Sequence, residues 1–257
     1  MIIHAKRHGF KFASIALAGW MALFGTADVL ARDPLRVVRV LDGDTVRISD
    51  GRTVRLLGVD TPEMGELRAK DAREWLVNES LGREVSLVEC AENDRYGRTL
   101  ALLESSGKIL NLDLLEAGLG VPMLIPPCAN PVARRVLRAS AEALKKRRGI
   151  YESKKYDPVP HLRAEEILGD RGVVFGKVAS IHRGKKALHL NFGEDWKTDF
   201  TAVLFARGQS RYRALGIDPE DFVGRNVFVL GKVENYYGPQ IVVDGPDQIL
   251  PLAEDLQ

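Results

Sequence analysis

The chain has 257 residues, of which 45% are hydrophobic, 28% charged and 7% aromatic. This balance is that of a globular protein and excludes a disordered, collagen-like or multi-span membrane chain. The 37 basic and 35 acidic residues leave a formal charge of +2, which excludes a protein that coats nucleic acid through bulk positive charge. The length predicts one or two domains, and any chemistry on a polyanion has to be local.

Residues 1–31 have the pattern of a secretory signal peptide. Three basic residues precede an apolar stretch from Phe12 to Phe24, and Val29-Leu30-Ala31 supplies the small residues that a signal peptidase reads. The alternative is an uncleaved anchor, but the stretch is nearer in length to a signal core than to the roughly 20 residues that span a bilayer. We expect cleavage near Ala31 and an exported protein, either periplasmic or secreted, with no membrane span in the mature chain.

The next part of the chain predicts a small β-barrel. Val37–Ile48 alternates on either side of an Asp-Gly dipeptide, which predicts two strands joined by a tight turn. Further strands are expected at 53–59, 85–88 and 99–103. Short strands at this spacing are typical of a barrel.

Three helices are expected beside these strands. Residues 66–80 carry apolar side chains near helical spacing, and 111–117 precede Gly118, a helix-ending residue. The strongest pattern begins at Pro131, a favoured first-turn residue, and ends with the cations of 145–148 and Gly149. Its apolar stripe consists of Val132, Val136, Leu137, Ala141 and Leu144.

A second unit follows residues 153–169, which read as a linker or bridging segment. Apolar or alternating runs predict five more strands and a helical insertion at 207–223. The expected strands are 173–181, 187–192, 200–205, 227–234 and 240–243. They fit an oligonucleotide/oligosaccharide-binding (OB) type of barrel over 170–250, although a generic small barrel fits equally well.

The two cysteines, Cys90 and Cys128, both lie in the exported part. An even number of thiols in an oxidising compartment is typical of a single disulfide. Two buried free thiols are the alternative, because sequence alone does not place two sulfurs within bonding distance.

Three separated segments carry residues suited to phosphate chemistry: 42–45, 55–63 and 94–98. Asp44 follows a turn and Asp60 ends a strand, positions from which two carboxylates can converge on one hard cation. Arg55 lies inside an apolar strand, where an unpaired guanidinium is costly and a phosphate is a fitting partner. Each segment alone reads as an ordinary turn or loop, so the signal is their combination.

In this order and spacing the segments resemble the staphylococcal nuclease (thermonuclease) family over about residues 36–152. The resemblance implies a mainly β fold with α-helices (α+β), in which an OB-like five-stranded barrel carries three helices. It also implies a calcium-dependent phosphodiesterase that acts on DNA and RNA. The expected organisation is therefore a nuclease-like domain at 32–152, a linker at 153–169 and a small OB-like barrel at 170–250.

The resemblance also assigns roles to residues. Asp44, Asp60 and the backbone carbonyl of Thr61 would bind Ca²⁺, and Asp42 would support these ligands without touching the ion. Glu63 would be the general base that polarises the attacking water.

Two arginines complete the implied catalytic set. Arg55 and Arg98 would grip the phosphate and neutralise the charge that grows in the transition state. Arg95 and Tyr96 would contact the phosphate of the neighbouring nucleotide.

The chain departs from the family in two ways that concern the site. The loop after Glu63 is short, and Leu124 stands where an aromatic residue would stack near the nucleotide. The resemblance also implies that Cys90, in the turn before the 94–98 loop, is a neighbour of Cys128, so that a disulfide between them would clamp the wall of the site.

The second unit has no assigned partner. Trp196, Tyr236 and Tyr237 would suit base stacking, with Arg183, Lys185 and Lys186 as phosphate contacts. The favoured alternative is that the aromatic residues belong partly to the core and the charges to a solvated face, because acidic and basic residues nearly balance there.

These observations predict an exported calcium-dependent nuclease that hydrolyses DNA and/or RNA. A catalytically silent nucleic-acid-binding or adaptor protein on the same barrel is the alternative, disfavoured because every residue of the implied catalytic set is present. A carbohydrate- or lipid-surface binder has no support beyond the expected second barrel.

Overall fold

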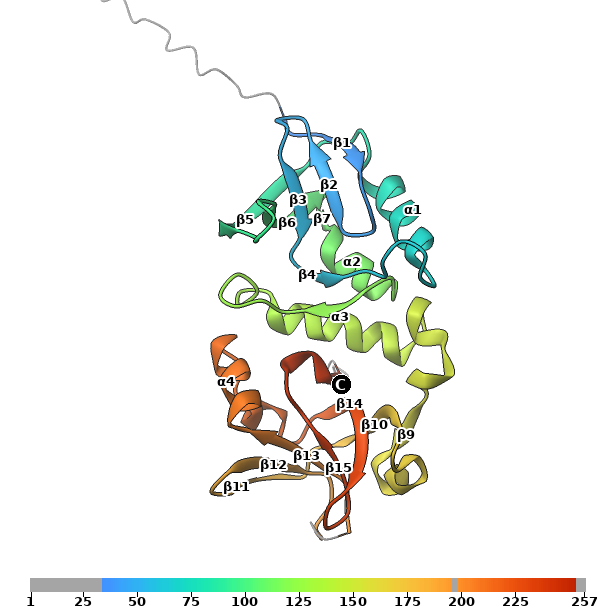
Figure 1. Ribbon diagram of the computed structural model, residues 1–257, viewed down its shortest axis with the longest axis vertical. Helices are drawn as coiled ribbons and strands as arrows, with labels where there is room; N and C mark the ends of the chain where they lie inside the picture. The colour runs from blue at the N-terminus through green and yellow to red at the C-terminus, as the bar shows by residue number, and fades with distance from the viewer. Residues whose placement is uncertain (1–33, 196–197, 253–257) are drawn as a thin grey trace, which may run out of the picture. The chain divides into compact units, whose positions relative to one another are not determined.

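The computed structural model describes residues 34–195 and 198–252 as an α+β protein with two main mixed sheets (Figure 1). The expected signal peptide at 1–31 and Trp196 lie outside the described residues. Described residues 34–252 belong to one compact unit. Their buried apolar side chains form a single hydrophobic cluster that draws on both sheets.

The first sheet has six strands, in the order β1-β2-β3-β6-β5 with β7 beside β6. Its strands are β1 (Val37–Val40), β2 (Thr45–Ile48), β3 (Thr53–Leu56), β5 (Ser86–Asn93), β6 (Thr99–Ser105) and β7 (Lys108–Ile109). The predicted hairpin is confirmed: β1 and β2 pair antiparallel, and β2 continues antiparallel to β3. β3 then pairs parallel with β6, which brings the 94–98 loop, just before β6, to the strand that carries Arg55.

A separate two-stranded sheet, which the sequence did not reveal as such, follows β3. β4 (Gly58–Asp60) pairs antiparallel with β8 (Val121–Met123), so Asp60 lies opposite Val121. A Cβ at Gly58 would lie 2.8 Å from the Val136 side chain, and Gly58 has a φ of +83°. Glycine at this position lets the chain turn out of β3 and pass close to a helix.

The three expected helices are α1 (Ala69–Ser80), α2 (Leu110–Glu116) and α3 (Ala133–Lys145). The apolar stripe of α3 is confirmed, because Val136, Leu137, Ala141 and Leu144 are buried. α1 begins at Ala69, three residues later than predicted, since Arg68 before it has a left-handed φ of 70°.

Two helix-ending glycines meet backbone to backbone. Gly118 follows α2 and Gly149 follows α3, and both have a positive φ. A Cβ on Gly118 would lie 2.1 Å from the Arg148 carbonyl oxygen, and one on Gly149 would lie 2.2 Å from the Gly118 oxygen. The Ile150 amide donates to that Gly118 oxygen at 2.8 Å. Only residues without a Cβ allow this approach.

Residues 153–169, interpreted as a linker or bridging segment, contain regular structure. The segment holds η2 (Lys154–Tyr156), β9 (Pro158–Pro160) and η3 (His161–Ile167), after η1 (Gly149–Glu152). β9 pairs parallel with β10 (Arg171–Lys177), so the segment is part of the second sheet.

The second sheet has eight strands in the order β11-β12-β13-β15-β14-β10-β9, with β16 beside β14. The remaining strands are β11 (Ser180–Arg183), β12 (Ala187–Asn191), β13 (Thr201–Phe205), β14 (Asn226–Asn235), β15 (Pro239–Val242) and β16 (Ile249–Pro251). The helical insertion is confirmed as α4 (Ala206–Ala214) and η4 (Pro219–Phe222), and η5 (Pro246–Gln248) leads into β16.

The expected closed barrels differ from the observed pairing. Within the residues that the structure describes, the strand order of each sheet runs from one edge to another without returning to its start. In the second sheet, however, only Val178 and Ala179 separate β10 from β11. In the first, an isolated bridge joins Arg36, before β1, to Glu84, before β5.

No helix in the described ranges is long and apolar enough to cross a membrane.

Candidate functional site

The site begins at the tight turn between β1 and β2. The side chain of Asp42 accepts a hydrogen bond from the Asp44 amide at 3.1 Å, which holds the turn. A Cβ on Gly43 would lie 2.6 Å from the Thr61 Oγ1 and 2.8 Å from the Ala72 Cβ. Glycine therefore lets the turn press against the chain that leaves β4.

Asp44 is buried and fully engaged. Its Oδ2 accepts hydrogen bonds from the Thr61 amide at 3.0 Å and the Thr61 hydroxyl at 2.9 Å, and its Oδ1 accepts from the Thr45 hydroxyl at 3.0 Å. Burial raises the pKa of Asp44, against the lowering effect of the Arg55 charge and the Thr61 amide. This carboxylate would gain from a further positive charge, because burial disfavours its ionised form.

Arg55 joins the two aspartates. Its side chain is 5% exposed, and its Nη2 lies 2.8 Å from the Asp60 Oδ1 and 3.1 Å from the Asp44 Oδ2. Its Nη1 donates to the carbonyl oxygens of Leu56 at 2.8 Å and Val59 at 2.6 Å. The sequence predicted a partner for this buried guanidinium, and the structure supplies carboxylates and carbonyls that fix its orientation.

Arg98 reaches the same network from the loop before β6. Its Nε donates to the Asp94 Oδ2 at 2.6 Å, and its Nη1 donates to the Thr45 hydroxyl at 3.5 Å, which in turn donates to Asp44. The guanidinium also lies 5.3 Å from the centre of the Tyr96 ring. The structure thus brings Asp44, Asp60, Arg55, Thr61 and Arg98 into one connected group.

Asp94 organises this loop, a role that the sequence motif did not reveal. Its Oδ1 accepts hydrogen bonds from the amides of Tyr96 and Arg98, each at 2.9 Å. Although partial burial acts to raise it, these hydrogen bonds and the contact with the Arg98 side chain lower the pKa of Asp94. An aspartate side chain often forms a turn by accepting a hydrogen bond from the amide two residues later, so the presence of Asp94 in the sequence could have predicted this turn.

Glu63 stands apart from this group. Its side chain is exposed on the loop between β4 and α1, and its amide donates a hydrogen bond to the Glu66 Oε2 at 2.8 Å. Among the described residues, no recorded contact joins the Glu63 carboxylate to Asp44, Asp60, Arg55 or Arg98. Arg95 and Tyr96 are exposed, with the Arg95 guanidinium 4.8 Å from the centre of the Tyr96 ring.

A cavity of about 420 Å³ opens beside the aspartate end of the site. Asp60 and Thr61 line it on one side, and Lys155 and Tyr156 of the bridging segment line it on another. The Lys155 ammonium lies 4.9 Å from the centre of the Tyr156 ring. The bridging segment therefore shapes the approach to Asp60.

The Cys90–Cys128 disulfide is confirmed, with the two Cα atoms 5.4 Å apart. Cys90 lies within β5 rather than in the turn that follows it, which corrects its expected position. Cys128 lies in the loop before α3. The cross-link fastens the strand that leads into the 94–98 loop.

The part of the chain that carries this site resembles known proteins. Residues 53–153 match the family described as "Staphylococcal nuclease homologue". A thermonuclease of Staphylococcus intermedius is 35% identical over 130 residues, which cover 45% of this chain and 74% of the relative. The chain belongs to the staphylococcal nuclease family.

Two further relatives differ in the share of their length that aligns with this chain. A thermonuclease of Staphylococcus hyicus is 30% identical over 128 residues, 46% of this chain and 75% of the relative. An uncharacterized endonuclease of Escherichia coli is 33% identical over 87 residues, 32% of this chain and 56% of the relative. Membership indicates a nuclease, that is, a hydrolase with a nucleic-acid substrate.

The donor set fits the calcium ion that is typical of the family. No group of three or more His, Cys, Asp and Glu side chains gathers at one point in the described ranges. Asp44 and Asp60 nevertheless lie 3.1 Å and 2.8 Å from the same Arg55 nitrogen, so the two carboxylates are close neighbours. Calcium takes six to eight oxygen ligands, and backbone carbonyls and waters can complete a shell begun by two carboxylates.

Proposed function

We propose that this protein is an exported, calcium-dependent nuclease that hydrolyses the phosphodiester bonds of DNA and/or RNA by in-line attack of water. Family membership supports the nuclease activity. The observation that carries the finer proposal is the single Arg55 nitrogen that contacts both Asp44, from the turn before β2, and Asp60, at the end of β4.

In this proposal Asp44, Asp60 and the carbonyl oxygen of Thr61 hold the calcium ion, and the Asp42 side chain keeps the turn of Asp44 in place. When bound, the ion supplies a Lewis acid and a template for the phosphoryl oxygens. Asp44 is suited to this because its hydrogen bonds from Thr61 and Thr45 prevent the carboxylate from turning away.

Arg55 and Arg98 grip the phosphate. Both guanidinium groups are fixed before substrate arrives, Arg55 by backbone carbonyls and Arg98 by Asp94. Preorganised donors stabilise growing negative charge without the cost of reorienting during the reaction. Glu63, exposed on the loop between β4 and α1, takes a proton from the attacking water. Arg95 and Tyr96 contact the neighbouring phosphate.

We further propose that residues 1–31 direct export and that two domains, 32–152 and 170–250, flank the segment 153–169. The disulfide supports an oxidising compartment. We interpret both sheets as OB-like barrels. In the second, β10 and β11 are then the halves of one bent strand, and in the first the Arg36–Glu84 bridge closes the ring.

The experiment is digestion of single-stranded DNA, duplex DNA and RNA by purified residues 32–257, with calcium and with chelator. We expect cleavage only with calcium. Arg98→Lys should lower kcat by roughly 100- to 1,000-fold, because lysine keeps the charge but loses the planar fork. Arg52→Lys is the matched control, since Arg52 likewise pairs through its Nε with a nearby aspartate, Asp50, but lies outside the site.

Glu63→Gln tests the general base separately. Equal rates for this variant and wild type would remove Glu63 from the mechanism while leaving the phosphate grip intact. Binding of nucleic acid without any calcium-dependent cleavage would instead favour the silent binding protein.

A further inference from the structure

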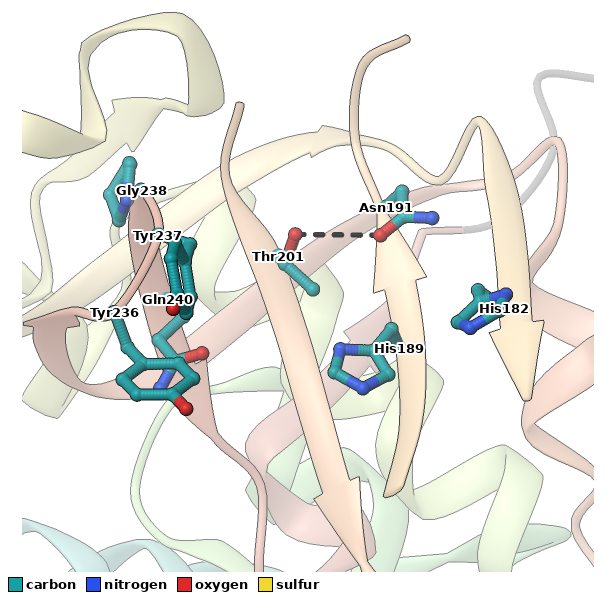
Figure 2. Close-up of a pocket in the computed structure, with 9 residues that line it drawn as sticks. His182, His189, Asn191, Thr201, Tyr236, Tyr237, Gly238 and Gln240 are labelled. Carbon is teal, nitrogen blue, oxygen red and sulfur yellow. Dashed lines mark hydrogen bonds between the residues drawn. The ribbon is translucent and has the colours of Figure 1, made fainter. Parts of the chain in front are cut away.

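The second sheet carries a cavity of about 530 Å³ that the nuclease chemistry does not use (Figure 2). Its lining comes from β11, β12, β13, β15 and the turn between β14 and β15. The lining residues are His182, His189, Asn191, Thr201, Tyr236, Tyr237, Gly238, Pro239 and Gln240. In Figure 2 the two tyrosines stand on one side of the cavity and the two histidines on the other.

Strand register explains how these side chains come together. Asn191, Thr201 and Gln240 are direct neighbours across β12, β13 and β15, and His182 is the neighbour of His189 across β11 and β12. Side chains alternate along a strand, so His189 and Asn191 point away from the face on which Leu188 and Leu190 join the core. The sheet therefore presents a polar row beside a pair of imidazole rings.

The tyrosines sit at the tip of the β14–β15 hairpin. Tyr236 and Tyr237 are 68% and 66% exposed, so the favoured expectation that they belong partly to the core was wrong. Their rings are 5.0 Å apart and nearly perpendicular. Tyr237 has a left-handed φ of +54°, which is uncommon for a bulky residue, at the turn between β14 and β15.

The chemistry of the lining indicates the class of ligand. Among the lining residues that the structure describes there is no carboxylate, lysine or arginine, and the amide side chains and hydroxyls supply both donors and acceptors. Burial, and then the neighbouring His182, lower the pKa of His189, which favours the uncharged form of this imidazole. A flat, uncharged ring with mixed donors and acceptors along its edge suits such a cavity.

Positive charge lies beside the cavity rather than in it. Lys185 and Lys186 are exposed at the tip of the β11–β12 hairpin, whose strands carry His182 and His189. Arg183, in contrast, is paired with Glu220 at 2.9 Å. A ligand with a neutral ring on an anionic backbone could place the ring in the cavity and the backbone beside the two lysines, whereas a neutral sugar would use only the cavity.

We propose that this cavity binds an unpaired base of single-stranded nucleic acid, with the base stacked on Tyr236 and the backbone directed toward Lys185 and Lys186. The proposal rests on the proposed nuclease function only in the choice of nucleic acid as the ligand. Duplex is a poor ligand here because its bases are already stacked and paired.

The test is the affinity of the full mature chain for a short fluorescein-labelled oligothymidylate, measured by anisotropy in chelator so that no cleavage occurs. We expect Tyr236→Ala to weaken binding by about 5- to 150-fold, the range for loss of one base–aromatic stack, and Tyr236→Phe to bind nearly as wild type. Tyr236→Leu should behave like the alanine variant, because it keeps bulk but loses the aromatic face. Phe205→Ala, which removes another exposed aromatic ring of the same sheet, should have no effect.

A second readout locates the contact. An oligonucleotide that carries 5-iodouracil should form a photochemical cross-link to Tyr236 or to His189. Unchanged affinity in Tyr236→Ala, or cross-links confined to Tyr96 of the nuclease site, would overturn the proposal. Competition by a neutral oligosaccharide as strong as that by unlabelled oligothymidylate would also overturn it, in favour of a carbohydrate site.

Cleavage of a nitrophenyl ester of thymidine phosphate separates this proposal from the nuclease proposal. This substrate offers a single nucleotide to the nuclease site, so Tyr236→Ala should hydrolyse it at the wild-type rate. Failure of all cleavage together with Tyr236-dependent binding would sink the nuclease proposal alone.

Discussion

Arg55 shows how far reasoning from single residues reaches. An arginine inside an apolar strand has to have partners, and that much follows from the cost of burying an unpaired charge. Its partners here are the Leu56 and Val59 carbonyls and Asp60, which follow Arg55 directly in the chain, together with Asp44, which the pairing of β2 with β3 brings beside it. The sequence identified the residues of the site, but the hydrogen bonds and ion pairs between them could be seen only in the structure.

Asp94 is expected to position Arg98. Asp94→Asn should lower kcat by about 10-fold or more with little change in KM, because the amide no longer holds the guanidinium in place by charge. Asp50→Asn is the matched control: Asp50 accepts from the Arg52 amide at 3.0 Å and from its Nε at 2.7 Å, away from the site. Equal losses in both variants would contradict a positioning role.

The same substitution has a pH signature. The pKa of Asp94 is lower in the folded chain than in the unfolded chain, so its stabilising contribution is complete above the ordinary pKa of about 4 and is lost as the pH falls through the folded value. The free energy of unfolding, measured in urea, should therefore decrease more for wild type than for Asp94→Asn as the pH drops below about 4.

Gly43 sets the distance between the Asp44 turn and Thr61. Gly43→Ala should destabilise the fold by about 1–3 kcal/mol, because the new methyl group would overlap Thr61 and Ala72. It should also weaken calcium binding, measured by calorimetric titration. Gly172→Ala, whose methyl group meets only the flexible end of Ile167, should leave calcium affinity unchanged.

At the scale of elements, periodicity located the longer helices and strands and missed the short ones. α3 was predictable because its stripe is long and its ends carry a proline and a glycine. β8 has three residues, too few to show an alternating pattern. The sequence predicted β3 and β4 as one strand, 53–59, because a single glycine at position 58 does not end the strand-like pattern. Asp60 owes its place to this β4–β8 pair, so the position of a candidate ligand depends on the elements least visible in sequence.

The disulfide fastens β5, the strand that leads into the loop of Arg98. Cys90 and Cys128 are 38 residues apart, and a cross-link over such a loop stabilises by about 2–4 kcal/mol through the unfolded chain. Cys90→Ser with Cys128→Ser should lower the unfolding free energy by this amount, measured in urea. Reductant should destabilise wild type and leave the double variant unaffected, and a drop in both would point to another cause.

At the scale of the whole molecule, the two sheets share one hydrophobic cluster, and α3 lies in contact with β16. We therefore expect one calorimetric unfolding transition for the mature chain. Calcium at about 100 times its Kd should stabilise that entire transition by about 2.7 kcal/mol. Two separate transitions, with only one shifted by calcium, would show that the sheets unfold independently.

The contact between Gly118 and Gly149 has a consequence for inheritance. Gly118 leaves room for the Arg148 carbonyl oxygen, and Gly149 leaves room for the Gly118 carbonyl oxygen. A side chain at either position would therefore force the two segments apart. Replacement of one glycine therefore removes the reason to retain the second. Across descendants of a common ancestor, these two positions should be kept together or lost together.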